Sequence, residues 1–373
     1  MPLNAERSFI LRALAAFAGP QGILDDAFCS SSLSGLDWNS VVNTAQKHRV
    51  LPFLAILLQR IGCLQRIPPK ARIPMETSLR EAALENFSRM TAFRKISGAF
   101  QREGIPLAPL KGIALTLSVY EETPARPMGD MDLLVRENDL GRIRKLLEKM
   151  DFRFAEGPNR WQAKLSASLI GRWSYVKGDV DIDLQWRPKF FVGPSVAEWD
   201  GLQALERALS FRDHGTEVRV LRPQDHMEYL LFQILNDFEM GYLFFLQLLD
   251  LGCLAKRHEE IWKQLVSQML QSWAPPSHPV VGIFTGLIQE VFLERKAWKD
   301  LSLKSREILE NLFEHPPTKP LAFGGSAFWR LRPSASQKIA FLAGYLFPSK
   351  GRSYREHLKR LRGRAKELTD RRT

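Results

Sequence analysis

Aspartates at alternating positions within apolar segments constrain this chain more than any other feature. Residues 129–135 read GDMDLLV, and the apolar residues around the acids are typical of a buried strand. Alternate side chains of a strand point to the same face about 6.6 Å apart, so Asp130 and Asp132 would share one face. At about 6 Å and an effective dielectric constant of about 20, their repulsion costs roughly 3 kcal/mol. A bound divalent cation would compensate for that cost.

A second segment, residues 180–186, repeats the pattern as VDIDLQW. Asp181 and Asp183 share one face of this predicted strand, and either could bring a third carboxylate to the first two. Mg²⁺ prefers oxygen ligands and is usually held by one or two carboxylates together with substrate phosphates. Phosphoryl and nucleotidyl transfer gain from two such ions about 3.5 to 4 Å apart. The two segments together predict a magnesium site for phosphate chemistry.

A phosphate-binding turn is predicted upstream of the acidic strand. Residues 109–112, PLKG, close an apolar run and precede a helical pattern at 113–120. The N-terminus of a helix offers unpaired N–H groups and a partial positive charge to an anion. Gly112 would let a triphosphate approach the backbone there.

Two cations flank this turn and the acidic strand. Lys111 would lie beside the phosphates, or it could be an exposed residue at the end of a strand. Arg126 precedes the acidic strand, and its planar guanidinium could bind phosphate bidentately. The competing interpretation pairs Arg126 with Glu121 or Glu122 on its own loop. The sequence alone does not decide between the two interpretations of either residue.

The remaining patterns predict a small sheet covered by helices between two helical regions. Helical spacing covers most of residues 6–102 and returns after Pro223. Short apolar runs indicate strands at 105–110, 131–135, 173–176 and 180–186. Helical patterns lie between or after these runs, at 113–120, 139–150, 224–258, 259–273, 279–292 and 305–313. The predicted parts are a helical region (1–102), a core (103–222) and a second helical region with a basic tail (223–373).

Composition adds limits on partners and compartment. The net charge of +12 suits a polyanionic partner, and residues 350–373 hold ten Lys or Arg residues against three acidic ones. This tail is interpreted as a solvated helix, with contact to nucleic acid or a membrane surface as the alternative. Three scattered cysteines indicate neither a disulfide framework nor a zinc site, which favours a reducing cytoplasm. The apolar stretch 229–255 carries too many polar groups for a membrane span and is predicted to be a buried helical hairpin.

Three motifs together resemble a known family. Residues 110–112 (LKG), 126–135 (RPMGDMDLLV) and 182–186 (IDLQW) are similar to the uncharacterised nucleotidyltransferase family of the polymerase-β-like superfamily. The similarity extends over most of the chain and includes residues 45–52 (AQKHRVLP) and 248–250 (LLD). The resemblance implies an α+β nucleotidyltransferase fold, in which a mixed sheet with helices is flanked by N- and C-terminal helical regions.

The resemblance also implies an activity and its residues. A member of this family would bind two Mg²⁺ ions and move a nucleotidyl group from an NTP to a hydroxyl-bearing small-molecule, sugar or peptide acceptor, releasing pyrophosphate. Asp130, Asp132 and Asp183 match the family's metal-binding and catalytic triad, which leaves Asp181 as a solvated neighbour. The residues expected to contact the substrate are Lys111, Gly112, Arg126 and Gly129.

This chain departs from the family pattern around the triad. The phosphate-binding Gly-Ser of the superfamily is Gly112-Ile113 here, and the usual histidine of the third strand is Gln185. No histidine occupies the position of Asn236 or Asp237, where members often carry one. The rival interpretation is therefore a catalytically silent protein that keeps the fold and binds nucleic acid or an assembly partner. The base of the NTP, the acceptor and the oligomeric state stay open.

Overall fold

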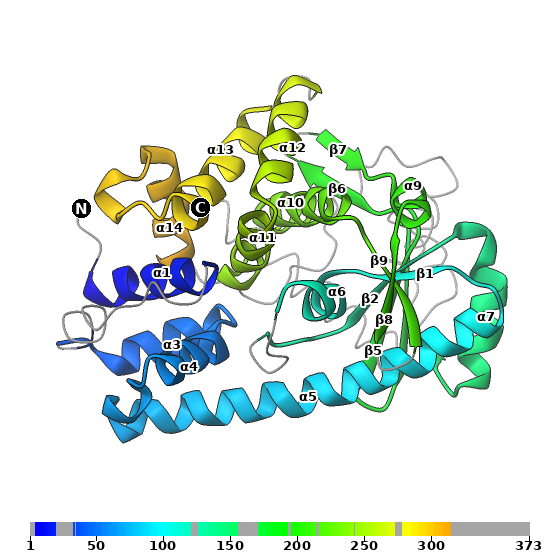
Figure 1. Cartoon of the computed structure of the whole chain (residues 1–373), viewed down its shortest axis with the longest axis horizontal. Helices are drawn as coiled ribbons and strands as arrows, with labels where there is room; N and C mark the ends of the chain where they lie inside the picture. The colour runs from blue at the N-terminus through cyan, green and yellow to red at the C-terminus, as the bar shows by residue number, and fades with distance from the viewer. Residues whose placement is uncertain are drawn as a thin grey trace, which may run out of the picture.

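The computed structural model describes residues 4–19, 33, 35–120, 126–155, 171–192, 195–213, 216–241, 243–272 and 278–314 (Figure 1). This part of the chain has the expected α+β architecture, in which a five-stranded mixed sheet is flanked by helices on both sides in sequence. The predicted basic tail lies outside the described residues.

The central sheet has the strand order β1-β2-β5-β4-β3. Its strands are β1 (Leu107–Pro109), β2 (Met131–Val135), β3 (Arg153–Phe154), β4 (Arg172–Lys177) and β5 (Val180–Gln185). Only β2 and β5 are parallel; the other three pairings are antiparallel. The predicted strands at 131–135, 173–176 and 180–186 are confirmed to within one residue, whereas the one at 105–110 is shorter than expected.

Several short strands escape the sequence pattern. They are β3 of the central sheet and two separate hairpins, formed by β6 (Lys189–Val192) with β7 (Ser195–Glu198) and by β8 (Leu209–Asp213) with β9 (Thr216–Val220). A short helix, α9 (Gly201–Glu206), lies between the hairpins in sequence. Both residues of β3 are exposed, as are the first four of β8, so neither strand shows the alternation of apolar and polar residues that identifies a half-buried strand.

Two helices follow strands of the central sheet. The first, α6 (Lys111–Ser118), follows β1 and begins two residues before its predicted start, so Lys111 belongs to its first turn. The second, α7 (Leu140–Lys149), follows β2 after the short turn η3 (Glu137–Asp139), close to its predicted range. Both connect the end of one strand to the next part of the sheet, as expected for a small core of strands and helices.

The remaining helices form the two flanking regions. The N-terminal set is α1 (Ala5–Phe17), α3 (Trp38–Lys47), α4 (Leu51–Arg60), η1 (Leu64–Arg66) and α5 (Pro69–Arg102). The C-terminal set is α10 (Pro223–Glu239), α11 (Phe245–Arg257), α12 (Glu259–Ser272), α13 (His278–Ile288), η4 (Gln289–Leu293), η5 (Trp298–Asp300) and α14 (Leu303–Glu314). The predicted hairpin at 229–255 is confirmed, because α10 and α11 pack on each other and are largely buried.

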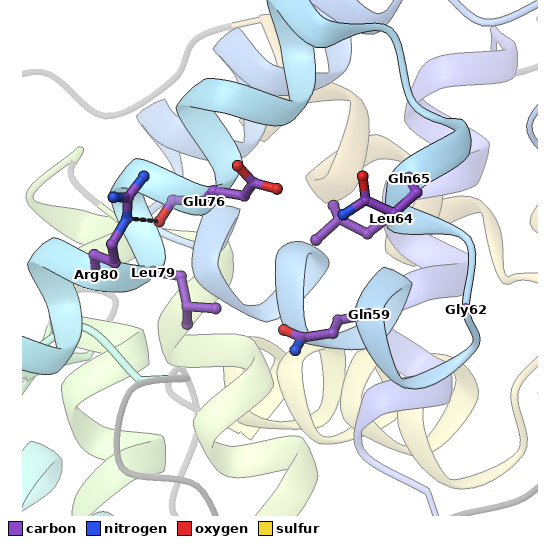
Figure 2. A pocket seen from close by; sticks show the side chains of 7 residues that line it. All are labelled: Gln59, Gly62, Leu64, Gln65, Glu76, Leu79 and Arg80. Atoms are coloured by element: carbon purple, nitrogen blue, oxygen red, sulfur yellow. Dashed lines mark hydrogen bonds between the residues drawn. The ribbon is translucent and has the colours of Figure 1, made fainter.

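Helix α5 is 34 residues long and connects two hydrophobic cores. Figure 1 shows it running along one side of the molecule, from α3 and α4 to α7. Its first turns contribute Ala71 and Met75 to the helical core, and its last turns contribute Phe93 and Phe100 to the core beneath the sheet. A pocket of about 540 Å³ lies where α5 passes α4 and η1 (Figure 2). Its lining residues are Gln59, Gly62, Leu64, Gln65, Glu76, Leu79 and Arg80.

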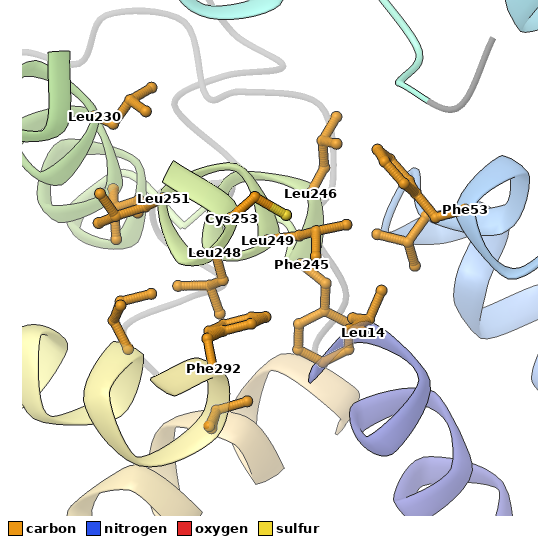
Figure 3. Close-up of a cluster of buried hydrophobic side chains, with 14 of the residues drawn as sticks. Leu14, Phe53, Leu230, Phe245, Leu246, Leu248, Leu249, Leu251, Cys253 and Phe292 are labelled. Atoms are coloured by element: carbon orange, nitrogen blue, oxygen red, sulfur yellow. The ribbon is translucent and has the colours of Figure 1, made fainter. Parts of the chain in front are cut away.

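The first and third parts of the sequence pack together in space. Leu14 of α1 and Phe53 of α4 lie in one cluster with Phe245 of α11 and Phe292 of η4 (Figure 3). Burying one such side chain contributes about 1.5 to 3 kcal/mol, so the cluster binds the two helical regions strongly. The three-part division at 102 and 222 stays a prediction about sequence segments, since two of those segments share a core.

The described helices and cysteines bear on the expectations about membrane spans and about disulfides. None of the described helices combines the length and apolar character that a membrane span requires. Of the described cysteines, Cys63 is disulfide-bonded, a bond that the sequence did not indicate, and Cys253 is a buried free thiol. The cysteines therefore no longer support the prediction of a reducing cytoplasm.

Candidate active site

The parallel pairing of β2 and β5 brings the predicted aspartates together. The register places Asp132 directly beside Asp183, so the two side chains stand at the same level on one face of the sheet. Asp130 immediately precedes β2 and is exposed, whereas Asp132 and Asp183 are buried. One carboxylate oxygen of each residue lies within 4.8 Å of the others. Asp181 is exposed and stands outside this cluster of three.

Two cations compensate for the buried carboxylates. The ammonium of Lys111 lies 2.9 Å from Asp132 Oδ1, and Arg172 Nη1 lies 3.2 Å from Asp183 Oδ2. Ser174, which is opposite Asp183 in the β4–β5 register, donates its hydroxyl to Asp183 Oδ1 at 2.5 Å. Arg172 and Ser174 were not predicted as site residues. Their position becomes visible only when β4 is known to pair antiparallel with β5.

Burial and neighbouring charges shift the acidity of the three carboxyls differently. Burial raises the pKa of Asp132 to about 7; Lys111 opposes this rise and Asp130 adds to it. Burial also raises the pKa of Asp183, against the opposing charge of Arg172. The pKa of Asp130, in contrast, is lowered, because the charges of Lys111 and Arg172 and the hydrogen bonds to this carboxylate together outweigh its partial loss of hydration. The exposed carboxylate is thus the most acidic of the three.

Lys111 is held in an unusual backbone conformation. Its φ of 46° lies in the left-handed region, which a residue with a side chain rarely adopts. Burial alone would lower the pKa of Lys111, but the surrounding acidic groups, with Asp132 the strongest, together outweigh that effect and raise the pKa well above its ordinary value. Lys111 is therefore a charged group at the N-terminus of α6, directly beside the acidic cluster.

Gln185 takes part in the site although it cannot titrate. Its amide nitrogen donates to Asp132 Oδ1 at 2.7 Å, and its amide oxygen accepts from the hydroxyl of Tyr229 at 3.1 Å. Tyr229 lies on α10 and is fully buried. The sequence shows Gln185 only as the loss of a histidine. The one signal at Tyr229 is a polar hydroxyl within an otherwise apolar helical segment.

Arg126 is bound within the protein by a buried ion pair. Its Nε and Nη2 donate to the two carboxylate oxygens of Asp250 at 3.0 and 2.7 Å, and the hydroxyl of Tyr120 donates to Oδ1 at 2.6 Å. Its backbone carbonyl accepts from Asn86 of α5 at 2.8 Å. The observed partner of the guanidinium is thus a carboxylate of α11. The alternative acids on its own loop lie outside the described residues.

The two predicted glycines of the site differ in their surroundings. A Cβ built on Gly112 would lie 2.6 Å from Arg126 Nη1 and 3.0 Å from Met128 Cγ, so a side chain there would force the buried guanidinium to move. Gly129 is exposed, has open space around its Cα, and uses its carbonyl to accept from Arg89 of α5. Packing therefore favours glycine at the start of α6, whereas the loop before β2 has room for a side chain.

The donor set suits a hard divalent cation. Three carboxylates converge, and each can offer an oxygen to a common point, which is the coordination chemistry that Mg²⁺ prefers. The two nearby cations show that the cluster attracts positive charge. None of the predicted site residues lines the pocket between α4 and α5, so that pocket belongs to another part of the molecule.

Comparisons with known proteins agree with the motifs. The family model described as an uncharacterised nucleotidyltransferase matches residues 34–274. Curated protein sequences give no significant match. A solution structure of the antibiotic-resistance factor ANT(2'')-Ia is 14% identical, covers 50% of this chain and 93% of its own, and has a TM-score of 0.35. A crystal structure of ANT(2'')-Ia with adenylyl-2''-tobramycin is 13% identical, covers 54% and 97%, and has a TM-score of 0.29. These structural scores are too low to identify an activity.

Proposed function

Because the chain belongs to the uncharacterised nucleotidyltransferase family, we propose that it moves a nucleotidyl group from an NTP to a hydroxyl-bearing acceptor and releases pyrophosphate. The observation that carries this proposal is the convergence of Asp130, Asp132 and Asp183, with one oxygen of each within 4.8 Å of the others. The acceptor class we favour is a small molecule, sugar or peptide.

The three aspartates would hold Mg²⁺, in the form of two ions. When bound, such ions neutralise charge on the leaving pyrophosphate and make a hydroxyl more nucleophilic. Lys111 and the backbone N–H groups at the start of α6 would bind the phosphates, because both present positive charge on the side of the triad. The absence of a side chain at Gly112 keeps that approach open.

The reaction forms a bond between the acceptor oxygen and the α-phosphorus and breaks the bond from that phosphorus to the pyrophosphate oxygen. The hydroxyl proton must pass to a base. Asp183 is the best suited of the three carboxyls, since burial raises its pKa and its side chain is 11% exposed, against 3% for Asp132. Asp130 keeps the lowest pKa and would stay ionised throughout.

A labelling experiment tests the proposal. Protein with Mg²⁺ and each α-labelled NTP is incubated with a small-molecule extract, and transfer of label and release of pyrophosphate are measured. The Asp130→Asn/Asp132→Asn variant should lose both signals. Asp181→Asn is the matched control, because Asp181 stands on the same strand as Asp183 but outside the cluster, and it should keep them.

The contrary outcome identifies the rival function. If wild-type protein neither binds an NTP nor transfers label, the enzymatic proposal fails. Salt-sensitive binding of RNA or DNA that the Asp130→Asn/Asp132→Asn variant leaves unchanged would then identify a non-catalytic protein that acts through its basic surface.

A further inference from the structure

Asp132 is bound on one oxygen only. Both Gln185 Nε2, at 2.7 Å, and Lys111 Nζ, at 2.9 Å, donate to its Oδ1. Oδ2 receives no hydrogen bond from the residues that the structure describes. Because the carboxylate is only 2% exposed, its two donors determine which way it faces.

The orientation of the Gln185 amide is determined at both ends. An ionised carboxylate only accepts hydrogen bonds, so Asp132 requires the nitrogen end of the amide. The amide oxygen then faces Tyr229 and accepts a hydrogen bond from its hydroxyl. Burial raises the pKa of Tyr229 above its ordinary value, so the hydroxyl keeps the proton that it donates.

The ring of Tyr229 is itself immobilised by aromatic neighbours. Phe190 of β6 lies 5.6 Å from it between ring centroids, and Trp199 lies 5.0 Å from it, both in edge-to-face geometry. Such packing stabilises a single ring position. The hydroxyl is therefore presented to Gln185 by a rigid support that comes from α10 and the neighbouring hairpin.

We infer that Tyr229 and Gln185 are positioning residues, which hold Asp132 with Oδ1 turned toward its two donors and Oδ2 turned toward the metal. This inference rests on the proposed function, because it assigns a role toward the divalent cation of the same site. A neutral amide here orients Asp132 without adding a charge, and the tyrosine fixes the amide. The histidine that the family pattern places at this position is replaced by a two-residue hydrogen-bonded relay.

Metal binding without substrate provides the test. Mn²⁺ is titrated into the full-length protein, and the free ion is measured by electron paramagnetic resonance. Loss of a residue that hydrogen-bonds directly to a metal-binding side chain typically changes metal affinity by about 10- to 100-fold. Tyr229 acts one hydrogen bond further from the metal, so Tyr229→Phe should weaken Mn²⁺ binding by about 3- to 10-fold. Tyr175→Phe is the control, since Tyr175 of β4 is equally buried but belongs to the other core. It should change affinity less than about twofold.

A second variant separates positioning from general loss of structure. Gln185→Asn shortens the amide so that it cannot reach both partners, and it should weaken Mn²⁺ binding at least as much as Tyr229→Phe. Adding Tyr229→Phe to Gln185→Asn should then have no further effect, because the relay is already broken. If the losses of Mn²⁺ affinity in the two single variants instead multiply in the double variant, the two residues act independently. That result would indicate a merely structural role and overturn the inference.

The remaining outcomes distinguish this inference from the proposed function. If wild-type protein binds Mn²⁺, the Asp130→Asn/Asp132→Asn variant does not, and Tyr229→Phe binds like wild type, only the positioning role is overturned. If wild-type protein binds no Mn²⁺ at all, the metal site and with it both proposals fail. Should Tyr229→Phe fail to fold, the Gln185→Asn titration decides: unchanged affinity in that variant refutes the relay.

Discussion

The buried ion pair between Arg126 and Asp250 offers the sharpest test of how the site is held. The two side chains are only 6% and 1% exposed, and three hydrogen bonds converge on the carboxylate, two from Arg126 and one from Tyr120. Removing one partner leaves an uncompensated buried charge, which costs about 3 to 5 kcal/mol. Arg126→Met and Asp250→Leu should therefore each destabilise the protein by about that amount, a large part of the roughly 5 to 15 kcal/mol that holds a domain folded.

The double variant Arg126→Met/Asp250→Leu should recover most of this loss. Replacing a whole buried pair by apolar residues is often neutral or even stabilising by about 1 to 4 kcal/mol. The hydroxyl of Tyr120 loses its acceptor, which costs about 1 to 3 kcal/mol. We expect the double variant to lie within about 2 kcal/mol of wild type, well above either single variant, in urea unfolding followed by fluorescence.

NTP binding by the same double variant decides what Arg126 does. If its guanidinium only anchors the loop before β2 to α11, the restored fold should bind NTP almost as wild type does. If it also contacts phosphate, affinity should stay at least tenfold weaker although stability has returned. Two results would refute the reasoning about the pair itself: a single variant as stable as wild type, or a double variant no more stable than the singles.

Three further predictions concern the packing around Gly112, the protonation of His226 and the binding of Mg²⁺. Gly112→Ala places a methyl group against Arg126, so it should cost about 1 to 3 kcal/mol in urea unfolding and weaken NTP binding. Burial lowers the pKa of His226 from 6.5 to about 3. The contribution of this neutral imidazole to the free energy of unfolding is complete above pH 6.5 and is lost as the pH falls toward 3. At pH 5 this loss is about 2 kcal/mol. In the His226→Gln variant, the free energies of unfolding at pH 7 and pH 5 should therefore differ by about that much less than in wild type. Mg²⁺ at ten times its dissociation constant should stabilise wild type by about 1.4 kcal/mol in thermal unfolding, and Asp130→Asn should lose that gain.

The sequence predicts those parts of the site that lie within one segment or in two adjacent strands. Residues 130–133 and 180–184 alternate acids with buried apolar residues, and that period of two identifies both the strands and the face that carries the aspartates. Asp130, Asp132 and Asp183 come together as expected because those strands are neighbours. The hairpin of α10 and α11 is similarly visible in its helical apolar spacing.

Several contacts that hold the site together could not be predicted, because they join residues far apart in sequence. Arg126 and Asp250 are 124 positions apart, and Gln185 and Tyr229 are 44 apart. Each is an ordinary polar residue in its own segment, and only the tertiary packing, of α10 beside β5 and of α11 beside the loop before β2, gives it a partner. The short strand β3 escaped for a different reason: it has two exposed residues and no apolar face to create a pattern.

Lys111 connects the strain of the backbone to the chemistry of the site. A left-handed conformation costs a residue with a side chain roughly 1 to 2 kcal/mol, a cost that glycine would avoid. The observed φ of 46° is therefore unfavourable for lysine, and the interaction that offsets it is the 2.9 Å ion pair with buried Asp132. The same ammonium stands at the N-terminus of α6, where the proposed phosphates would bind. A strained lysine at this point thus supplies a charge that compensates Asp132 in the absence of substrate and lies within the site that an NTP would enter.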